Sequence, residues 1–590
     1  MKSGTIDYII IAVYMAVVVG IGFLFTKKNE TTENYLLGGR NMPVFAIGLS
    51  CMMSLLSSIS IVRAPGEIFN NGFTLSMFGV LTLLLQIPAY MLFTRFYFKL
   101  GSFTPYEYLE YRYNTGIRTL ISISSFYGRT LYIGMVLYTT SKIFEGAYGW
   151  EPWFTISFVG VIGVFYTVMG GMKAVVWTDV IQFFVLSIGL VVTLVVLCCS
   201  IDGGAVGAVV YSFKNGHGIP QLHDPDFYKI TPYMRLLFWL LLWHALVGPL
   251  GGACSDQINI QRLLATRNWQ AGFRAQVIST LLGIASSIIL WFIGFAIYSY
   301  YSQHPDPVVT HAGGDIAFFR FVATKLPTPM PGLFMAAMLA AIMSTLDSGI
   351  NSMATVWLKE FHSKFINRHM TNEQEVLVSR LATFWIGAFS ILLGIGIQVS
   401  GKWLSQTASE VGTIFGILGA ATVPAFLLAV LTKRANAPLI WGYTFFSFGC
   451  TIGGSSWFVL SRTAEQAWLK NPVLPFGWAD KLSAVYVIVP IVCGVAMCVP
   501  WLVRSLRKTA GAKALALLGL VWFGFLLNTA QWYYFSNLYI HDVPLSRSFA
   551  FSLPISFIGV FLVVWFCPVQ PEKKWRGLTL ATINDTIAGR

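Results

Sequence analysis

A short polar run interrupts an otherwise apolar stretch at residues 331–357. Ser344 and Thr345 stand side by side there, and Asp347 and Ser348 follow them. An ionised carboxylate inside a membrane-spanning stretch is costly unless it has a partner, so such a residue is a candidate for function. Clustered oxygen ligands suit a hard cation such as Na⁺. Alternatively, these hydroxyls hydrogen-bond to their own helix or join neighbouring helices.

Two more charged residues lie inside apolar stretches. Asp179 stands near the start of the stretch at 177–200. It is a candidate ion ligand or relay there, and an equally good alternative is that its carboxylate stabilises the N-terminus of a helix. Arg129 stands within the stretch at 118–147. Its planar guanidinium matches a carboxylate, which predicts a clamp for an anionic substrate. A structural ion pair with an intramembrane acid, or snorkelling to the membrane surface, is the alternative for Arg129.

The elements that must position these residues are membrane spans. Hydrophobic residues make up 56% of the 590 residues, charged residues only 11%, and the mean hydropathy is +0.67. This composition excludes disordered, fibrous, secreted disulfide-rich and nucleic-acid-binding proteins, despite the net charge of +14. Since a span needs about 20 apolar residues, the sequence predicts an all-α polytopic membrane protein with about fifteen transmembrane helices. They fall at 5–25, 42–63, 73–95, 118–147, 152–170, 177–200, 234–262, 275–300, 331–357, 377–400, 409–432, 438–460, 482–503, 513–533 and 549–567.

Two of these spans contain residues that break helices. The second is rich in serine and runs into Pro65-Gly66, and the seventh is interrupted by glycines and a proline at Gly248, Pro249, Gly251 and Gly252. Freed backbone groups in a membrane must find new partners or line a wet cavity. Interrupted spans at corresponding places in two halves of a chain are typical of a transporter's midplane site, and these two are five spans apart. The alternative is that each is a packing kink.

The loops suggest an orientation and a class. Most Lys and Arg residues fall in alternate loops, which predicts an external N-terminus and a cytoplasmic C-terminus in a multi-pass inner or plasma membrane protein. No loop is long enough for a large soluble domain, and no catalytic motif is present. We therefore expect a monomeric non-enzyme that transports a small solute, lies in the lipid bilayer and binds no nucleic acid. A membrane sensor that binds solute without moving it is the less favoured class.

Four motifs resemble the sodium/solute symporter family. They are LLSSISIVRAPGEIFNNG (55–72), GGMKAVVWTDVIQ (170–182), SDQINIQRLLATR (255–267) and AAIMSTLDSGINSMATV (340–356). The resemblance implies a LeuT-like core of two inverted five-helix repeats and uptake driven by the sodium gradient through alternating access. The implied domains are an N-terminal helix and loop (1–41), the two repeats (42–200 and 234–435), C-terminal helices (436–567) and a cytoplasmic tail (568–590).

The resemblance also implies two sodium sites. The first would use backbone oxygens and hydroxyls of Met53, Leu56, Ala341, Ser344 and Thr345. A second site, present in some members, would fall on Asp179, Ser344, Asp347 and Ser348. The family often has a hydroxyl residue at position 347. The extra charge of Asp347 could hold a cation more tightly or hold a proton, so sodium and proton coupling both stay open.

The expected substrate is a small organic acid. Ser57, Ser58 and Ser60 together with Arg129 resemble the sialic-acid carriers of the family, and the APGEIF run is similar to the monocarboxylate and vitamin branch. This implies sodium symport of sialic acid, a related sugar acid or a monocarboxylate. A neutral sugar or amino acid is the alternative within the same class.

Overall fold

The computed structural model describes residues 5–26, 31–228, 238–399, 422–445, 560–561 and 564–587, and no strand occurs among them. The chain divides into two compact units. One comprises 1–107, 129–227 and 244–408, and the other 108–128, 228–243 and 409–590. Seven helices of the described residues are long and apolar enough to cross a membrane, or eight if one bent pair counts as a span. The spans predicted between 446 and 559 lie outside the described residues.

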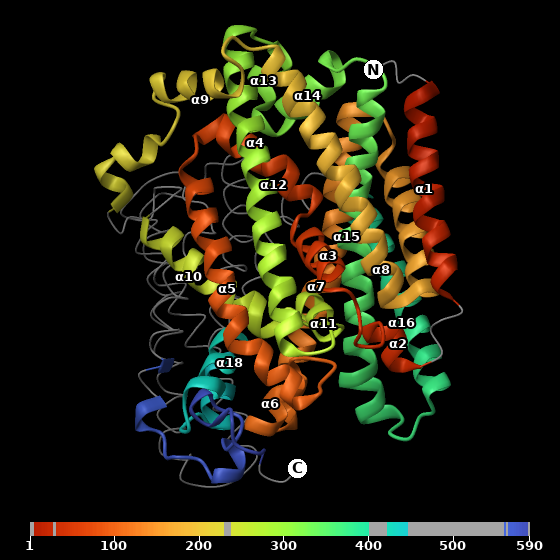
Figure 1. The fold of residues 1–590 in the computed structure, drawn as a ribbon, viewed down its shortest axis with the longest axis vertical. Helices are drawn as coiled ribbons and strands as arrows, with labels where there is room; N and C mark the ends of the chain where they lie inside the picture. The colour runs from red at the N-terminus through yellow and green to blue at the C-terminus, as the bar shows by residue number, and fades with distance from the viewer. Residues whose placement is uncertain are drawn as a thin grey trace, which may run out of the picture. The chain divides into compact units, whose positions relative to one another are not determined.

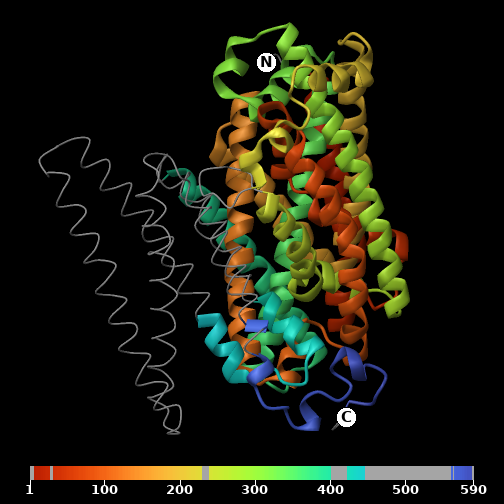
Figure 2. The ribbon, with the colours of Figure 1, turned by 90° about the vertical axis from the view of Figure 1, so that its left-hand side faces the viewer.

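The described helices follow the hydropathy pattern closely. In Figures 1 and 2 the long helices of the first unit run along a common direction. The long helices are α1 (Thr5–Thr26), α5 (Thr74–Leu100), α7 (Thr115–Tyr148), α8 (Pro152–Cys199), α12 (Trp269–Gln303), α15 (Met330–Val356) and α16 (Asn372–Val399). The shorter ones are α2 (Thr32–Leu37), α3 (Val44–Leu55), α4 (Ser58–Asn71), α6 (Tyr106–Arg112), α9 (Gly204–Lys214), α10 (Phe238–Ser255), α11 (Gln257–Leu264), α13 (Pro307–Ala312), α14 (Gly314–Lys325) and α18 (Thr422–Leu431).

Helix α8 contains two of the predicted spans, joined at a sharp kink. A straight helix of its 48 residues would measure about 72 Å, well beyond the thickness of a bilayer core. At Gly171 the backbone has φ 56° and ψ −156°, and a Cβ there would lie 2.7 Å from the Tyr35 carbonyl oxygen. Glycine tolerates this conformation, and the spans predicted at 152–170 and 177–200 meet there.

The predicted break in the second span is confirmed. Helices α3 and α4 meet at an angle of 62°, with Leu56 and Ser57 between them. Ser57 caps α4 because its side chain accepts a hydrogen bond from the Ser60 backbone N–H.

The position predicted for the break in the seventh span is wrong. Helix α10 continues through Gly248, Pro249, Gly251 and Gly252 to Ser255, and the chain breaks at Asp256 before α11 begins. A helix in a packed bundle tolerates an internal proline when its neighbours satisfy the freed carbonyl group. Asp256 decides the break because its side chain accepts the backbone N–H of Ile258 and so starts a new helix.

Helix α15 is the most buried of the long helices. In its most apolar window, 94% of the residues lie inside the protein. It packs against α8, α1, α16 and α3, and Figure 1 shows α1, α8 and α15 side by side. Its many alanine, serine and glycine residues permit this close packing. The polar run at 344–348 therefore faces protein on all sides.

The buried Asp7 of α1 stabilises the start of α15. Its Oδ1 accepts the Gly332 backbone N–H at 2.9 Å, and the residue is only 2% exposed. A carboxylate at a helix N-terminus satisfies a free donor and favours the helix dipole. We expect Asp7→Ala to lower the free energy of unfolding by about 1–2 kcal/mol, and Asp7→Asn, which keeps an acceptor, to lower it less. Thermal unfolding in detergent measures both. Equal stability of Asp7→Ala and the unmodified protein would contradict this role.

The second unit is held together around a buried arginine. Arg112 is 1% exposed, and its guanidinium donates to three backbone carbonyls, those of Ala429 (2.8 Å), Thr432 (2.6 Å) and Lys574 (2.7 Å). Tyr108 also donates its hydroxyl to the Leu578 carbonyl at 2.6 Å. The segment near the C-terminus thus packs against α6 and α18 within this unit.

Candidate ion and substrate site

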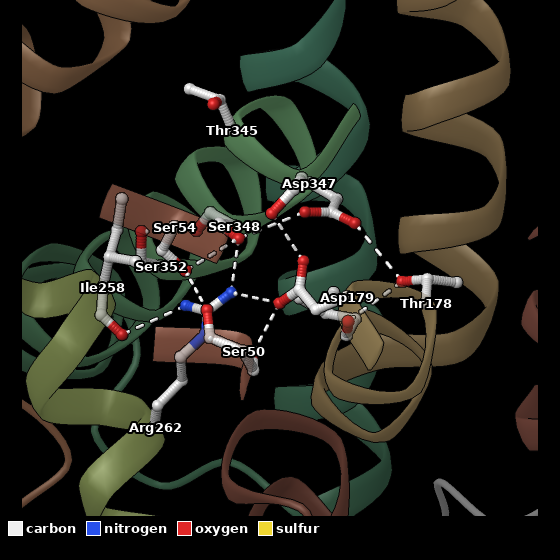
Figure 3. A network of polar contacts seen from close by, with 12 residues as sticks. Ser50, Ser54, Thr178, Asp179, Ile258, Arg262, Thr345, Asp347, Ser348 and Ser352 are labelled. Carbon is white, nitrogen blue, oxygen red and sulfur yellow. Dashed lines mark hydrogen bonds and ion pairs between the residues drawn. The ribbon is translucent and has the colours of Figure 1, made fainter. Parts of the chain in front are cut away.

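A buried ion pair links α8 to α11. Arg262 Nη2 lies 3.1 Å from Asp179 Oδ2, and the two side chains are 1% and 0% exposed. Arg262 Nε donates to Ser50 Oγ at 2.6 Å and Nη1 donates to the Ile258 carbonyl at 3.1 Å. Arg262 Nη2 also donates to Ser348 (Figure 3). Asp179 lies inside α8, two turns beyond its kink at Gly171, so it does not cap a helix start.

A second carboxylate joins the same network. Asp347 Oδ2 accepts the Tyr166 hydroxyl at 2.6 Å, and its Oδ1 accepts the Ser348 hydroxyl at 3.1 Å. The Thr178 hydroxyl also donates to Asp347 Oδ2, at 3.5 Å. Ser348 links Asp347 to Arg262, so with both acids ionised the network holds two carboxylates and one guanidinium and has a net charge of −1. Such a buried negative charge favours a bound cation.

The structure brings together all four residues predicted for the second sodium site. Ser344 donates to Asp179 Oδ1 at 2.6 Å, and Ser348 bridges Asp347 and Arg262. Sequence reasoning missed Arg262, although a signal existed: two acids inside spans require a cation, and the polar run of the seventh span ends in this arginine. It also missed the hydroxyl donors Ser50 and Tyr166, which have no distinguishing local pattern.

The residues predicted for the first sodium site lie where α3 ends and along α15. Met53 is in the last turn of α3 and Leu56 follows it, and α3 packs on α15. Thr345 donates its hydroxyl to the Ala341 carbonyl at 3.0 Å, so two of the predicted oxygen ligands are adjacent. Figure 3 shows Thr345 apart from the Arg262 network. A hydroxyl bonded to its own helix is the alternative to an ion ligand that the sequence left open for this polar run. The first sodium site remains a prediction.

Arg129 forms an ion pair at the break between α10 and α11. Its Nη2 lies 3.1 Å from Asp256 Oδ1 and 3.4 Å from Oδ2, and the side chains are 25% and 24% exposed. The guanidinium also lies over the Tyr132 ring, 5.5 Å from its centre. Nε and Nη1 donate to none of the residues that the structure describes. Within the described part of the chain, Arg129 thus pairs with an intramembrane acid and has two nitrogens, Nε and Nη1, without an acceptor.

The serines predicted to bind substrate have different surroundings. The hydroxyls of Ser57 and Ser60 lie 3.3 Å apart at the break between α3 and α4, and Ser58 lies 2.8 Å from the Thr140 hydroxyl of α7. Arg129 precedes Thr140 by three turns, about 16 Å along the helix. Among the described residues no hydrogen bond joins Arg129 to these serines. The structure therefore places Ser58 beside α7, but about 16 Å along that helix from Arg129.

Comparison with known proteins decides the family. The sodium:solute symporter family model matches residues 35–442, well over half of the chain. The chain belongs to the sodium:solute symporter family. Members couple solute movement to sodium, and the apolar helices agree with a multi-pass membrane transporter.

Three similar proteins of this family are named as carriers of sialic acid, monocarboxylates and vitamins. The sodium/sialic acid symporter NanT of Aliivibrio fischeri is 26% identical over 438 residues, which cover 74% of this chain and 84% of NanT. Human sodium-coupled monocarboxylate transporter 2 is 26% identical over 475 residues, 78% of this chain and 74% of the transporter. The sodium-dependent multivitamin transporter of Oryctolagus cuniculus is 27% identical, over 73% of this chain and 67% of the transporter.

A solved structure shares the fold of this family member. It is the substrate-bound outward-open state of a Na⁺-coupled sialic acid symporter, with a TM-score of 0.68 and 21% sequence identity. The match covers 90% of this chain and 98% of that one.

Proposed function

We propose that this chain is a sodium symporter of a small organic acid and that Arg129 binds the substrate carboxylate. The observation that carries the proposal is the partial exposure and incomplete hydrogen bonding of the Arg129 side chain. It is a quarter exposed, lies at a helix break, and uses one nitrogen on Asp256 while Nε and Nη1 have no described acceptor. A guanidinium with free forked donors suits a carboxylate. The sialic acid and monocarboxylate transporters among its relatives support the same substrate class.

Sodium would bind at two places in this proposal. The first site uses Met53, Leu56, Ala341, Ser344 and Thr345, and the second uses Asp179, Ser344, Asp347 and Ser348. The negative charge of the Asp179–Asp347–Arg262 network supports the second site. The breaks between α3 and α4 and between α10 and α11 support a LeuT-like pair of inverted repeats that works by alternating access. We place the N-terminus outside and the C-terminus in the cytoplasm of a monomeric carrier.

A neutral solute is the second candidate. The Arg129–Asp256 pair is neutral as a unit, which favours a sugar or amino acid over an acid if the pair stays closed during transport. The two candidates differ in whether a substrate carboxylate engages Arg129.

Uptake into proteoliposomes distinguishes them. Purified protein is reconstituted, and an inward sodium gradient drives labelled sialic acid, pyruvate, proline or galactose, with potassium and proton gradients as controls. We expect sodium-driven accumulation of an acid, and we expect Arg129→Ala to lower it about tenfold or more because a charge-assisted contact is lost.

The matched control is Arg320→Ala, which removes a more exposed arginine of α14 from its pair with Asp306, the cap of α13. It should leave acid uptake unchanged. Intact acid uptake by Arg129→Ala would contradict the proposal, and sodium-driven uptake of proline or galactose alone would favour the neutral solute.

A further inference from the structure

Asp256 is held in place independently of Arg129. Its Oδ1 accepts the Ile258 backbone N–H at 3.2 Å, and its Oδ2 accepts the Asn259 side-chain amide at 3.1 Å. The carboxylate therefore belongs to the start of α11, whereas Arg129 belongs to α7. Their ion pair is a contact between two helices, and its acidic half remains in position when the pair opens.

A symporter has to pass through a state without substrate. If Arg129 holds the substrate carboxylate, substrate release leaves a guanidinium within the membrane-spanning part of the protein. An unpaired charge there is costly. It would slow the return of the empty carrier, because the empty site must then close around that charge. Asp256 lies at ion-pair distance and can balance that charge.

We propose that Asp256 is an internal counter-anion that replaces the substrate carboxylate on Arg129 whenever the carrier is empty. This inference rests on the proposed function of Arg129. Asp256 is then a positioning residue: it neutralises and orients Arg129, and it competes with the incoming acid. Asp256 contacts only Nη2 of Arg129, and Nε and Nη1 have no acceptor among the described residues, so a substrate can begin the exchange there.

The same short helix connects this exchange to the ion network. Asp256 stands at the start of α11, and Arg262 lies six residues further on, about 9 Å along the helix axis. Arg262 holds Asp179 and Ser348 of the proposed second sodium site. Any movement of α11 during transport would therefore act on the counter-anion and on the ligands of the cation together.

The test compares two modes of transport in Asp256→Asn. Asparagine is an equally good helix cap and keeps an acceptor for Ile258, but it has no charge. Net uptake requires the empty carrier to return, whereas exchange of labelled for unlabelled acid across the liposome membrane does not. We expect net uptake to fall about tenfold, exchange to stay within about twofold, and the apparent KM for the acid to decrease because its competitor is gone.

Two further variants make the result specific. Asp306→Asn is the matched control, because Asp306 also caps a short helix through a backbone N–H, that of Val308, and pairs with Arg320. It should change neither mode of transport. Asp256→Glu retains the charge and should recover part of the net uptake.

The outcomes separate this inference from the proposed function. Equal loss of net uptake and exchange in Asp256→Asn, or no loss of either, would overturn the counter-anion role while leaving Arg129 as the acid contact. Retention of acid uptake in Arg129→Ala would overturn the proposed function and this inference together.

Discussion

Arg262→Ala should give a protein that is strongly destabilised and does not transport. The substitution leaves the buried Asp179 without its cationic partner in a network that also holds the buried Asp347, and it removes donors to Ser50 and Ser348. Breaking a buried ion pair by removing one partner costs about 3–5 kcal/mol. Thermal unfolding in detergent and sodium-driven uptake measure the two effects. Arg262→Lys should recover only part of the stability, because an ammonium cannot reproduce the planar fork of donors.

Arg320→Ala is the control for this variant. Arg320 also pairs with an aspartate, Asp306, and its hydrogen bond to that carboxyl lowers the carboxyl's pKa. The pair is much more exposed, and water screens a surface pair, so its loss should change stability little. If Arg262→Ala were as stable and as active in uptake as Arg320→Ala, the buried network would not be needed for folding or for transport.

Asp347→Asn should weaken sodium activation without unfolding the protein. The amide keeps the size of the side chain and an oxygen for the Tyr166 hydroxyl, but the net charge of the network changes from −1 to zero. A cation bound there loses an adjacent negative charge. We expect the sodium concentration for half-maximal uptake to rise about tenfold or more. The measurement is acid uptake as a function of sodium at constant ionic strength.

Asp7→Asn is the matched control, since it neutralises a different buried acid on α1 and keeps its acceptor for Gly332. It should leave sodium activation unchanged. An unchanged sodium curve in Asp347→Asn, combined with loss of any pH dependence of uptake, would instead assign a proton to Asp347.

Local sequence predicted the helices of the first unit well. The spans expected at 5–25 and 331–357 are α1 at Thr5–Thr26 and α15 at Met330–Val356. The length of an apolar run determines a span because every backbone group within a bilayer must be paired inside the helix. Helix breaks were harder to place. Pro65 and Pro249 both lie inside helices, because packing against neighbours can outweigh propensity, whereas Ser57 and Asp256 mark the breaks by capping new helices.

The sequence by itself determined that this is a polytopic helical protein, that it resembles sodium/solute symporters, and that Asp179, Asp347 and Arg129 need partners. Only the tertiary structure decided which partners they have. Asp179 pairs with Arg262, 83 residues away, and Arg129 pairs with Asp256, 127 residues away. The period of a helix determines which residues share a face, but not which face meets which neighbour. That choice depends on the packing of all the helices together, and it joins one guanidinium to Asp179 directly and to Asp347 through Ser348.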